Sequence, residues 1–212
     1  MFIHFGKYRN QCLKDILEKD QRYLEWLITQ PWYKIKFKDL CNQTIHLLNE
    51  KNKEPIIVDE NTTTIYTDGA CSHNGSNKAK MGIGVYFSKK NKISIPNVSS
   101  CLMIDNPTNN RAELSAIKEA LVLCKEKNIK TKIMIYTDSE YSIKSITLWY
   151  PDWLMKNKLK DKKNVDILEM ISPLYTELDV KFNHIRSHTG LTDEHSRGNE
   201  MADRLAVESL KR

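Results

Sequence analysis

Cysteine is scarce in this chain and is not arranged for cross-linking. The 212 residues contain five cysteines, an odd number, and no two of them form a CxxC pair. Disulfide-stapled domains and zinc ribbons depend on paired cysteines at short spacing. The sequence therefore argues against both a disulfide framework and a cysteine-based zinc site, and it favours a reducing compartment.

Long apolar runs are also missing. No segment approaches the roughly 18 consecutive apolar residues that a membrane-spanning helix needs, and the first residues, MFIHFGKYRN, are too polar for a secretory signal peptide. With 40% hydrophobic and 28% charged residues, the composition is that of a globular protein with a sizeable core. We expect an intracellular protein, in the cytoplasm or nucleus, without a membrane partner.

The excess of positive charge is small. A net charge of +6 and a pI near 8.9 lean toward a polyanionic partner, although many basic soluble proteins share this balance. Residues 1–60 carry ten Lys plus Arg against nine Asp plus Glu, so the positive excess lies in the rest of the chain. Charge alone does not assign a function.

The pattern divides the chain into a small and a large part. Residues 1–48 show two apolar stripes at helical spacing, which predict short helices. The stripes are Leu13, Ile16, Leu17 and Tyr23, Leu24, Leu27. Asp20 is placed to cap the second helix. The charged residues 49–62 read as a linker, and 63–212 as a separate domain.

Residues 63–212 alternate between strand and helix patterns. Five runs rich in β-branched and aromatic residues predict strands. They begin at Thr63 and continue at 82–87, 92–98, 132–137 and 180–187. The expected order, β-β-β-α-β-α-α-β-α, describes an α/β domain with a mixed five-stranded sheet flanked by helices. Pro173 should end or kink the third helix-like segment of this domain, VDILEMISPLY.

The tetrapeptide IYTD occurs twice, ending at Asp68 and at Asp138. Each copy closes a strand-like run, and ligands in open α/β sheets gather outside the carboxyl ends of strands. If the two strands are parallel neighbours, the two carboxylates meet at one edge of the sheet. The alternative is that each aspartate only starts a turn or caps a helix.

Two further acids have ordinary alternatives of their own. Glu113 lies early in a predicted helix, where Asn110-x-x-Glu113 resembles a capping box. Asp203 lies on the last helix, where a solvated position is usual. Together the four carboxylates suit a hard cation such as Mg²⁺ better than zinc. Two such ions roughly 4 Å apart serve phosphodiester cleavage.

Residues 63–212 resemble type 1 ribonuclease H, a family that cuts the RNA strand of RNA–DNA hybrids. The matching stretches, in the family's order, are YTDGACSHNG, GIGVYF, TNNRAEL, YTDSEYSIKSITLW, KNVD, SHTG and GNEMADRLA. The resemblance implies the ribonuclease H fold, whose first and fourth strands lie side by side. It also implies endonuclease activity with two Mg²⁺ ions, or Mn²⁺ as a substitute, leaving 5′-phosphate and 3′-hydroxyl ends.

The resemblance assigns roles to acids and histidines. The metal-binding acids it implies are Asp68, Glu113, Asp138 and Asp203. His188, in SHTG, matches a mobile histidine that helps product leave. His195 is a second candidate, because the loop before the final acid is longer than the family's usual spacing. We favour His188 as the functional histidine and leave the role of His195 undecided.

The resemblance also implies substrate contacts. Asn74, Asn109 and Asn110 match positions that contact the 2′-OH of RNA, a role for which an amide can both donate and accept. Turn and helix-entry chemistry is the alternative for these asparagines. Thr108 and Asn164 match a pocket for a DNA-strand phosphate.

The match to the family's substrate contacts is incomplete at two places, Asn106 and residues 154–163. Asn106 stands where many eukaryotic members have an arginine in the phosphate pocket, which points to a weaker pocket. Trp149 matches an aromatic that packs on a DNA sugar, and Trp153 matches a core neighbour. Residues 154–163, LMKNKLKDKK, replace a basic protrusion with a shorter segment holding five lysines. It reads either as a phosphate contact or as a solvated charged helix.

The amino-terminal part resembles a different family. FGKYRNQCLKDILEKDQRYLEWLITQPW is similar to the small FGKY/YLxWL module of exonuclease-X-like proteins and of proteins from large DNA viruses. The glycine and aromatic pattern of the eukaryotic hybrid-binding domain is not found. The module would bind either nucleic acid, through Lys7, Arg9 and neighbours, or another protein. The resemblance also implies a large DNA virus as one source of the chain.

The sequence thus predicts a monomeric, metal-dependent endonuclease whose partner is an RNA–DNA hybrid. Two other classes compete with it. A non-catalytic hybrid-binding protein would not need the intact set of acids. A structure-specific DNA nuclease is possible because the fold hosts several nucleases, but it would not need amides at 2′-OH positions.

Overall fold

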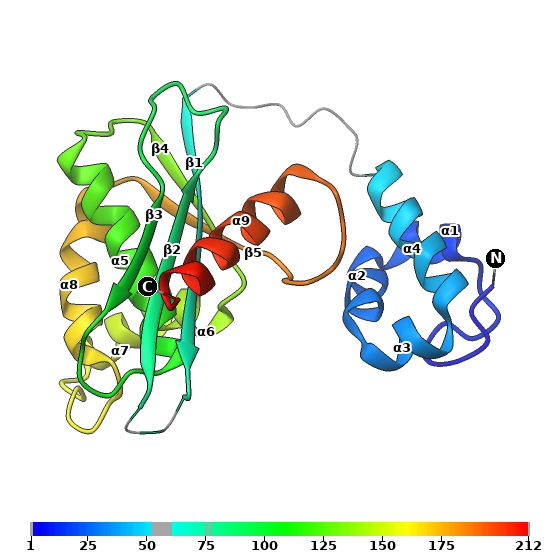
Figure 1. The fold of residues 1–212 in the computed structure, drawn as a ribbon, viewed down its shortest axis with the longest axis horizontal. Coiled ribbons are helices and arrows are strands. Elements are labelled where there is room, and N and C mark those ends of the chain that lie inside the picture. The colour runs from blue at the N-terminus through cyan, green and yellow to red at the C-terminus, as the bar shows by residue number, and fades with distance from the viewer. Residues whose placement is uncertain (1, 52–60, 75, 77, 212) are drawn as a thin grey trace. The chain divides into compact units, whose positions relative to one another are not determined.

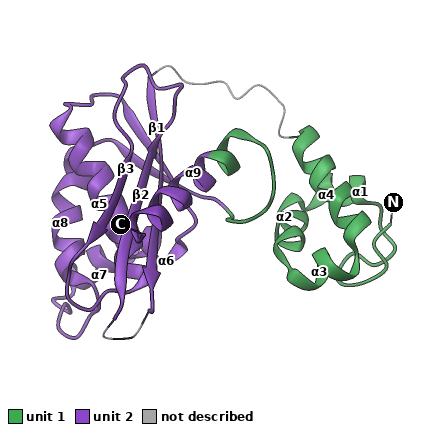
Figure 2. Ribbon diagram, in the orientation of Figure 1, with its two compact units in different colours: residues 1–57, 186–197 green, residues 58–185, 198–212 purple. Residues whose placement is uncertain are grey.

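A computed structural model describes residues 2–51, 61–74, 76 and 78–211 of the chain. It divides into two compact units, residues 1–57 with 186–197 and residues 58–185 with 198–212 (Figure 2). Most of the predicted linker, residues 52–60, lies outside the described part, so the proposed domain boundaries stay a prediction. No helix in the described part is both long and apolar enough to cross a bilayer.

The larger unit is built on one five-stranded mixed sheet with the order β3-β2-β1-β4-β5 (Figure 1). The antiparallel pairs are β1–β2 and β2–β3, and the parallel pairs are β1–β4 and β4–β5. The strands are β1 Thr62–Ser72, β2 Lys80–Phe87, β3 Val98–Leu102, β4 Lys132–Thr137 and β5 Val180–His184. The predicted mixed α/β sheet is confirmed.

Helices cover both faces of this sheet. They are α5 Asn109–Glu126, α6 Glu140–Lys144, the π-helical turn η1 Ser145–Trp149, α7 Tyr150–Met155, α8 Val165–Glu177 and α9 Glu194–Ser209. In β2, Val85 and Phe87 pack into the main core with α5 and α8, whereas Gly82 and Gly84 meet the backbone of α9. Because alternate strand residues point to opposite faces, α9 covers the face away from α5 (Figure 1).

The third strand differs from its prediction. Residues 92–97 are not a strand, and β3 begins only at Val98. Pro96 has no backbone N–H to give to a ladder. Asn97 instead accepts the N–H of Phe87 on its Oδ1, at 3.0 Å. Strand propensity in KISIPNV was therefore overridden by the proline and by a side chain that bonds to the backbone.

Two helices are longer than predicted. α8 continues through Pro173 to Glu177, because its buried residues Ile167 and Ile171 hold it against the core despite the missing hydrogen bond. α9 begins at Glu194, ahead of the predicted start at Gly198. Asp193 accounts for this early start, since its carboxylate accepts the backbone N–H groups of His195 and Ser196.

The smaller unit contains four short helices around its own core. They are α1 Leu13–Lys19, α2 Gln21–Thr29, α3 Pro31–Lys36 and α4 Lys38–Lys51. Asp20 caps α2 as predicted, accepting the N–H of Tyr23, and it also accepts from Lys7 Nζ at 3.0 Å and Tyr8 Oη at 2.7 Å. The Lys-Tyr pair of the FGKY motif therefore fastens the first loop to α2.

Candidate active site

Parallel pairing of β1 with β4 sets the two IYTD copies in register. Ile65 lies opposite Ile135 and Tyr66 opposite Tyr136, and the tyrosine rings stack with centroids 5.3 Å apart. Two residues further along each copy come Asp68 and Asp138. The predicted adjacency of these strands is confirmed, and it carries both carboxylates to the same level of the sheet.

Asp68 is not at the end of its strand, contrary to the prediction. β1 continues to Ser72 because its pairing with β2 extends that far, with Ser72 opposite Lys80. β4 does end at Thr137, directly before Asp138. Asp68 is therefore held on a central strand and is only 7% exposed.

A glycine lets α5 approach β1 closely enough to bring in Glu113. A Cβ atom at Gly69 would overlap the backbone of Ala112 and Glu113. Only a residue without a side chain permits this approach. Because Gly69 follows Asp68 directly, the contact sets Glu113 beside Asp68.

The capping-box alternative for Glu113 is wrong. The residue that caps α5 is Thr108, whose Oγ1 accepts the N–H of Arg111 at 3.2 Å. In a capping box the carboxylate lies three residues after the cap, and Glu113 lies further along the helix from Thr108 than that. The carboxylate of Glu113 therefore does not cap the helix.

A second glycine contact positions α9. Gly84 pairs with Asp68 across the β1–β2 ladder, and a Cβ atom there would overlap the carbonyl of Ala202. The next residue of α9 is Asp203. Its negative charge is one cause of the raised pKa of both Asp68 and Glu113, so it acts on the cluster electrostatically.

Three of the predicted acids converge. Carboxylate oxygens of Asp68, Glu113 and Asp138 lie within 4.8 Å of one another, in the geometry of a metal site. Burial, followed by the charges of Asp138 and Asp203, raises the pKa of Asp68 to about 8. Burial and the charge of Asp68 raise the pKa of Glu113 well above its ordinary value.

The cluster fits a divalent cation. Buried carboxylates this close repel each other unless a proton or a cation lies between them. Within the described part of the chain, the buried Oε2 of Glu113 has no hydrogen-bond partner. An unpartnered buried carboxylate oxygen is costly, and a hard cation with oxygen ligands would satisfy it.

A family model described as RNase H matches residues 60–211, which is most of the chain. The chain belongs to the ribonuclease H family. A second model, described as exodeoxyribonuclease X-like C-terminal, matches residues 3–30 in the amino-terminal module. Both resemblances predicted from the sequence motifs are confirmed.

Named ribonuclease H relatives come from animals and bacteria. Ribonuclease H1 of Mus musculus is 35% identical over 152 residues, which cover 69% of this chain and 50% of the mouse protein. Ribonuclease H of Orientia tsutsugamushi (strain Boryong) is 39% identical over 158 residues, covering 69% of this chain and 83% of that protein. The aligned part thus spans half the length of the mouse relative.

A solved structure shares the fold. The foamy viral protease-reverse transcriptase in complex with RNA/DNA hybrid superposes with a TM-score of 0.52 at 25% identity. The match covers 74% of this chain and 21% of that one. The sheet and its helices therefore superpose on one part of that longer chain.

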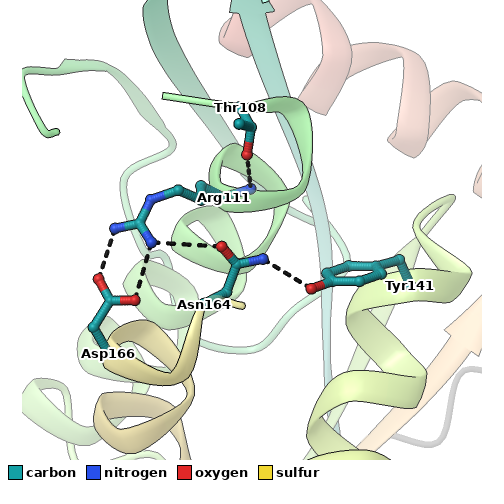
Figure 3. Close-up of polar contacts among 5 residues, drawn as sticks. All are labelled: Thr108, Arg111, Tyr141, Asn164 and Asp166. Carbon is teal, nitrogen blue, oxygen red and sulfur yellow. Dashed lines mark hydrogen bonds and ion pairs between the residues drawn. The ribbon is translucent and has the colours of Figure 1, made fainter. Parts of the chain in front are cut away.

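Thr108 and Asn164, the residues of the predicted phosphate pocket, belong to a group of polar contacts that joins two helices (Figure 3). Arg111 of α5 makes a two-pronged salt bridge with Asp166 of α8, at 2.9 and 2.6 Å, and its Nη1 lies 3.5 Å from Asn164 Oδ1. Asn164 Nδ2 donates to the hydroxyl of Tyr141 at 2.8 Å. The Asn164 amide is thus fixed at both ends, close to Thr108.

Sequence reasoning had assigned no role to Arg111, Asp166 or Tyr141. All three lie inside quoted family motifs, but the ion pair joins residues 55 positions apart, which no local pattern reveals. Arg111 and Asp166 hold α5 against α8. They therefore orient the pocket that Thr108 and Asn164 were predicted to form.

The other predicted substrate residues lie on the surface. Asn74 is exposed in the turn after β1, and Asn109 and Asn110 are exposed in the first turn of α5. Trp149 is 36% exposed at the end of η1, with its ring edge-on to Tyr141 at 5.6 Å. These positions leave the side chains accessible to a polymer.

The lysine-rich segment 154–163 is not a charged helix. α7 ends at Met155, and the following residues form turns in which all five lysines are exposed. Lys162 lies over the ring of Trp153, with Nζ 5.2 Å from the centroid, and Trp153 packs against the core as predicted. The helical alternative is therefore wrong, and phosphate contact stays a prediction.

The two candidate histidines belong to the smaller unit. His188 is exposed in the loop between β5 and α9 and has a positive φ of 52°. His195 is already in the first turn of α9, and its N–H bonds to Asp193 at 3.0 Å. Only His188 stands on a loop, which favours it over His195 as the mobile histidine.

Proposed function

We propose that this chain is an endonuclease that hydrolyses the RNA strand of RNA–DNA hybrids. The convergence of Asp68, Glu113 and Asp138 within 4.8 Å carries the proposal. Membership of the ribonuclease H family supports it. A binding protein without catalysis also has no use for three mutually repelling carboxylates so close together.

Two Mg²⁺ ions held by these acids and Asp203 would supply activation of a water and stabilisation of the leaving oxygen. The chain's own part is to fix the four carboxylates, which lie on β1, on α5, directly after β4 and on α9. Glycine contacts at Gly69 and Gly84 set two of these elements. Water attack with departure of the 3′-oxygen leaves 5′-phosphate and 3′-hydroxyl ends.

Exposed residues distinguish the RNA strand from the DNA strand. The exposed amides of Asn74, Asn109 and Asn110 can each donate to and accept from a 2′-OH, which DNA lacks. For the DNA strand, the hydroxyl of Thr108 keeps its proton free to donate to a phosphate while it caps α5. The foamy viral relative bound to RNA/DNA hybrid supports this substrate class.

The test is a cleavage assay on four labelled duplexes of one sequence. They are the RNA–DNA hybrid labelled on the RNA strand, the same hybrid labelled on the DNA strand, an RNA–RNA duplex and a DNA–DNA duplex. We expect cuts only in the RNA strand of hybrids, only with Mg²⁺ or Mn²⁺, and none in EDTA. Binding without cleavage would favour the non-catalytic class. Cleavage of the all-DNA duplex would favour a DNA nuclease.

A further inference from the structure

The loop between β5 and α9 carries an apolar residue that the catalytic unit does not bury. Leu191 is 6% exposed and is part of the hydrophobic cluster of the smaller unit, together with residues of all four module helices. Residues 186–197 group with that unit as a whole (Figure 2). Burying a leucine side chain contributes about 1.5–3 kcal/mol. The contact of Leu191 therefore holds the loop on the hydrophobic cluster of the smaller unit.

Polar contacts fix the loop on either side of Leu191. The N–H of Thr192 donates to Oδ1 of Asn49, from α4, at 2.9 Å. Nζ of Lys34, from α3, donates to the backbone carbonyl of His188 at 3.1 Å. Both hydrogen bonds join residues more than a hundred positions apart, so neither follows from local chain geometry.

The loop is also ordered internally. Thr189, 4% exposed, accepts the N–H of Leu191 on its Oγ1 at 3.2 Å. Asp193 caps α9, with its carboxylate bonded to the hydroxyl of Ser196 at 2.7 Å. A loop built this way moves as one piece, so anchoring Leu191 restrains the backbone of His188 while its imidazole stays exposed.

We propose that the amino-terminal module is a clamp that positions the His188 loop of the nuclease. Leu191, Asn49 and Lys34 are its positioning residues, because each acts through a contact between the loop and the module. This rests on the proposed function and extends it, because it gives the module a role within the same chain. Releasing the loop should slow product release rather than the cut itself.

The experiment compares full-length wild type with Leu191→Ser, Asn49→Ala and the control Ile35→Ser. Ile35 is in the same unit but 83% exposed, so its replacement leaves the clamp intact. Hydrogen exchange of residues 186–193 and cleavage of hybrid in single and multiple turnover are measured. Asn49→Ala removes a clamp contact without touching the core, which covers the case in which Leu191→Ser unfolds the module.

We expect faster exchange of the loop in both clamp variants and a multiple-turnover kcat lowered roughly three- to tenfold, with the single-turnover rate unchanged. Unchanged loop exchange, or faster exchange with unchanged kcat, would overturn the clamp. Failure of the proposed function would give a different result. Wild type would then leave the hybrid uncut, while hydrogen exchange of residues 186–193 would still be faster in Leu191→Ser than in Ile35→Ser.

Discussion

At the residue scale, the acids differ in what surrounds them. Asp68 and Glu113 are buried and carry raised pKa values, whereas Asp138 follows the end of β4 and is partly exposed. His184 Nε2 lies 3.1 Å from the backbone carbonyl of Asp138, which helps to fix the chain at that point. Replacing Asp138 should therefore disturb the core less than replacing Asp68.

Asp138→Asn should lower the cleavage rate at least about a hundredfold while leaving hybrid affinity largely intact, because a neutral amide is a poor ligand for a hard cation. Single-turnover cleavage and a filter-binding titration measure the two effects. Asp15→Asn, on the exposed side of α1, serves as the control and should change neither. Substantial residual turnover in Asp138→Asn would contradict the metal assignment.

The raised pKa of Asp68 predicts how stability depends on pH without metal. Between pH 3.8, the ordinary pKa of an aspartate, and about pH 8, folded Asp68 keeps a proton that the unfolded chain has lost. The free energy of unfolding should therefore fall as pH rises through this window, by up to about 1.4 kcal/mol per pH unit for each such proton.

Urea unfolding in EDTA from pH 4 to pH 9 tests this pH dependence. Asp68→Asn removes the buried charge, so it should flatten the slope and make the metal-free protein more stable than wild type at pH 8. Mg²⁺ should raise the stability of wild type at pH 8 and not that of the variant. A slope of the opposite sign would show that Asp68 is ionised in the folded state.

At the element scale, two glycines decide where the helices cross the sheet. Gly69 admits the first turn of α5, and Gly84 admits α9, which is how Glu113 and Asp203 reach a strand that carries Asp68. The Arg111–Asp166 pair then joins α5 to α8 beside the predicted phosphate pocket. The site is thus a product of close helix–strand packing.

Gly69→Ala should destabilise the protein by roughly 1–3 kcal/mol, because the new methyl group overlaps backbone that cannot rotate away. Cleavage should fall more steeply than stability suggests, since α5 shifts and Glu113 shifts with it. Thermal unfolding and single-turnover cleavage give the two numbers. Ser72→Ala, near the end of the same strand, should stay within about 0.5 kcal/mol of wild type.

At the scale of the whole molecule, each of the two units has a hydrophobic core of its own. The larger unit has its own core, formed by the sheet with α5 and α8. The smaller unit has another core, completed by Leu191 from the loop between β5 and α9. Residues 186–197, which follow β5 in the sequence, therefore group with the smaller unit.

A fragment starting at residue 61 should fold and cut hybrid, because its sheet keeps its full core. With the clamp absent, its multiple-turnover kcat should already be lowered, and Leu191→Ser should then have no further effect on turnover. Circular dichroism and the same kinetic assay check both points. A fragment that cannot fold would show that the predicted linker is wrongly placed.

Much of the fold was determined by the sequence alone. Alternation of residues in TIYT, GIGVYF and KIMIYT specifies strands, and apolar spacing specifies α5 and the module helices, because these signals are local. The doubled IYTD and the ordered motifs predicted four acids, and three of them, Asp68, Glu113 and Asp138, converge in the structure. Prediction failed where one local signal opposed another, as at Pro96 and Pro173, since packing rather than propensity decided those residues.

Tertiary structure alone decided the contacts between distant residues. The Arg111–Asp166 pair, the closeness of α5 to Gly69 and the burial of Leu191 in the module join positions that share no pattern in the sequence. Local sequence sets the direction of each side chain along its own element. Only the packing of elements fixes which side chains meet, because that depends on the shape of the whole core.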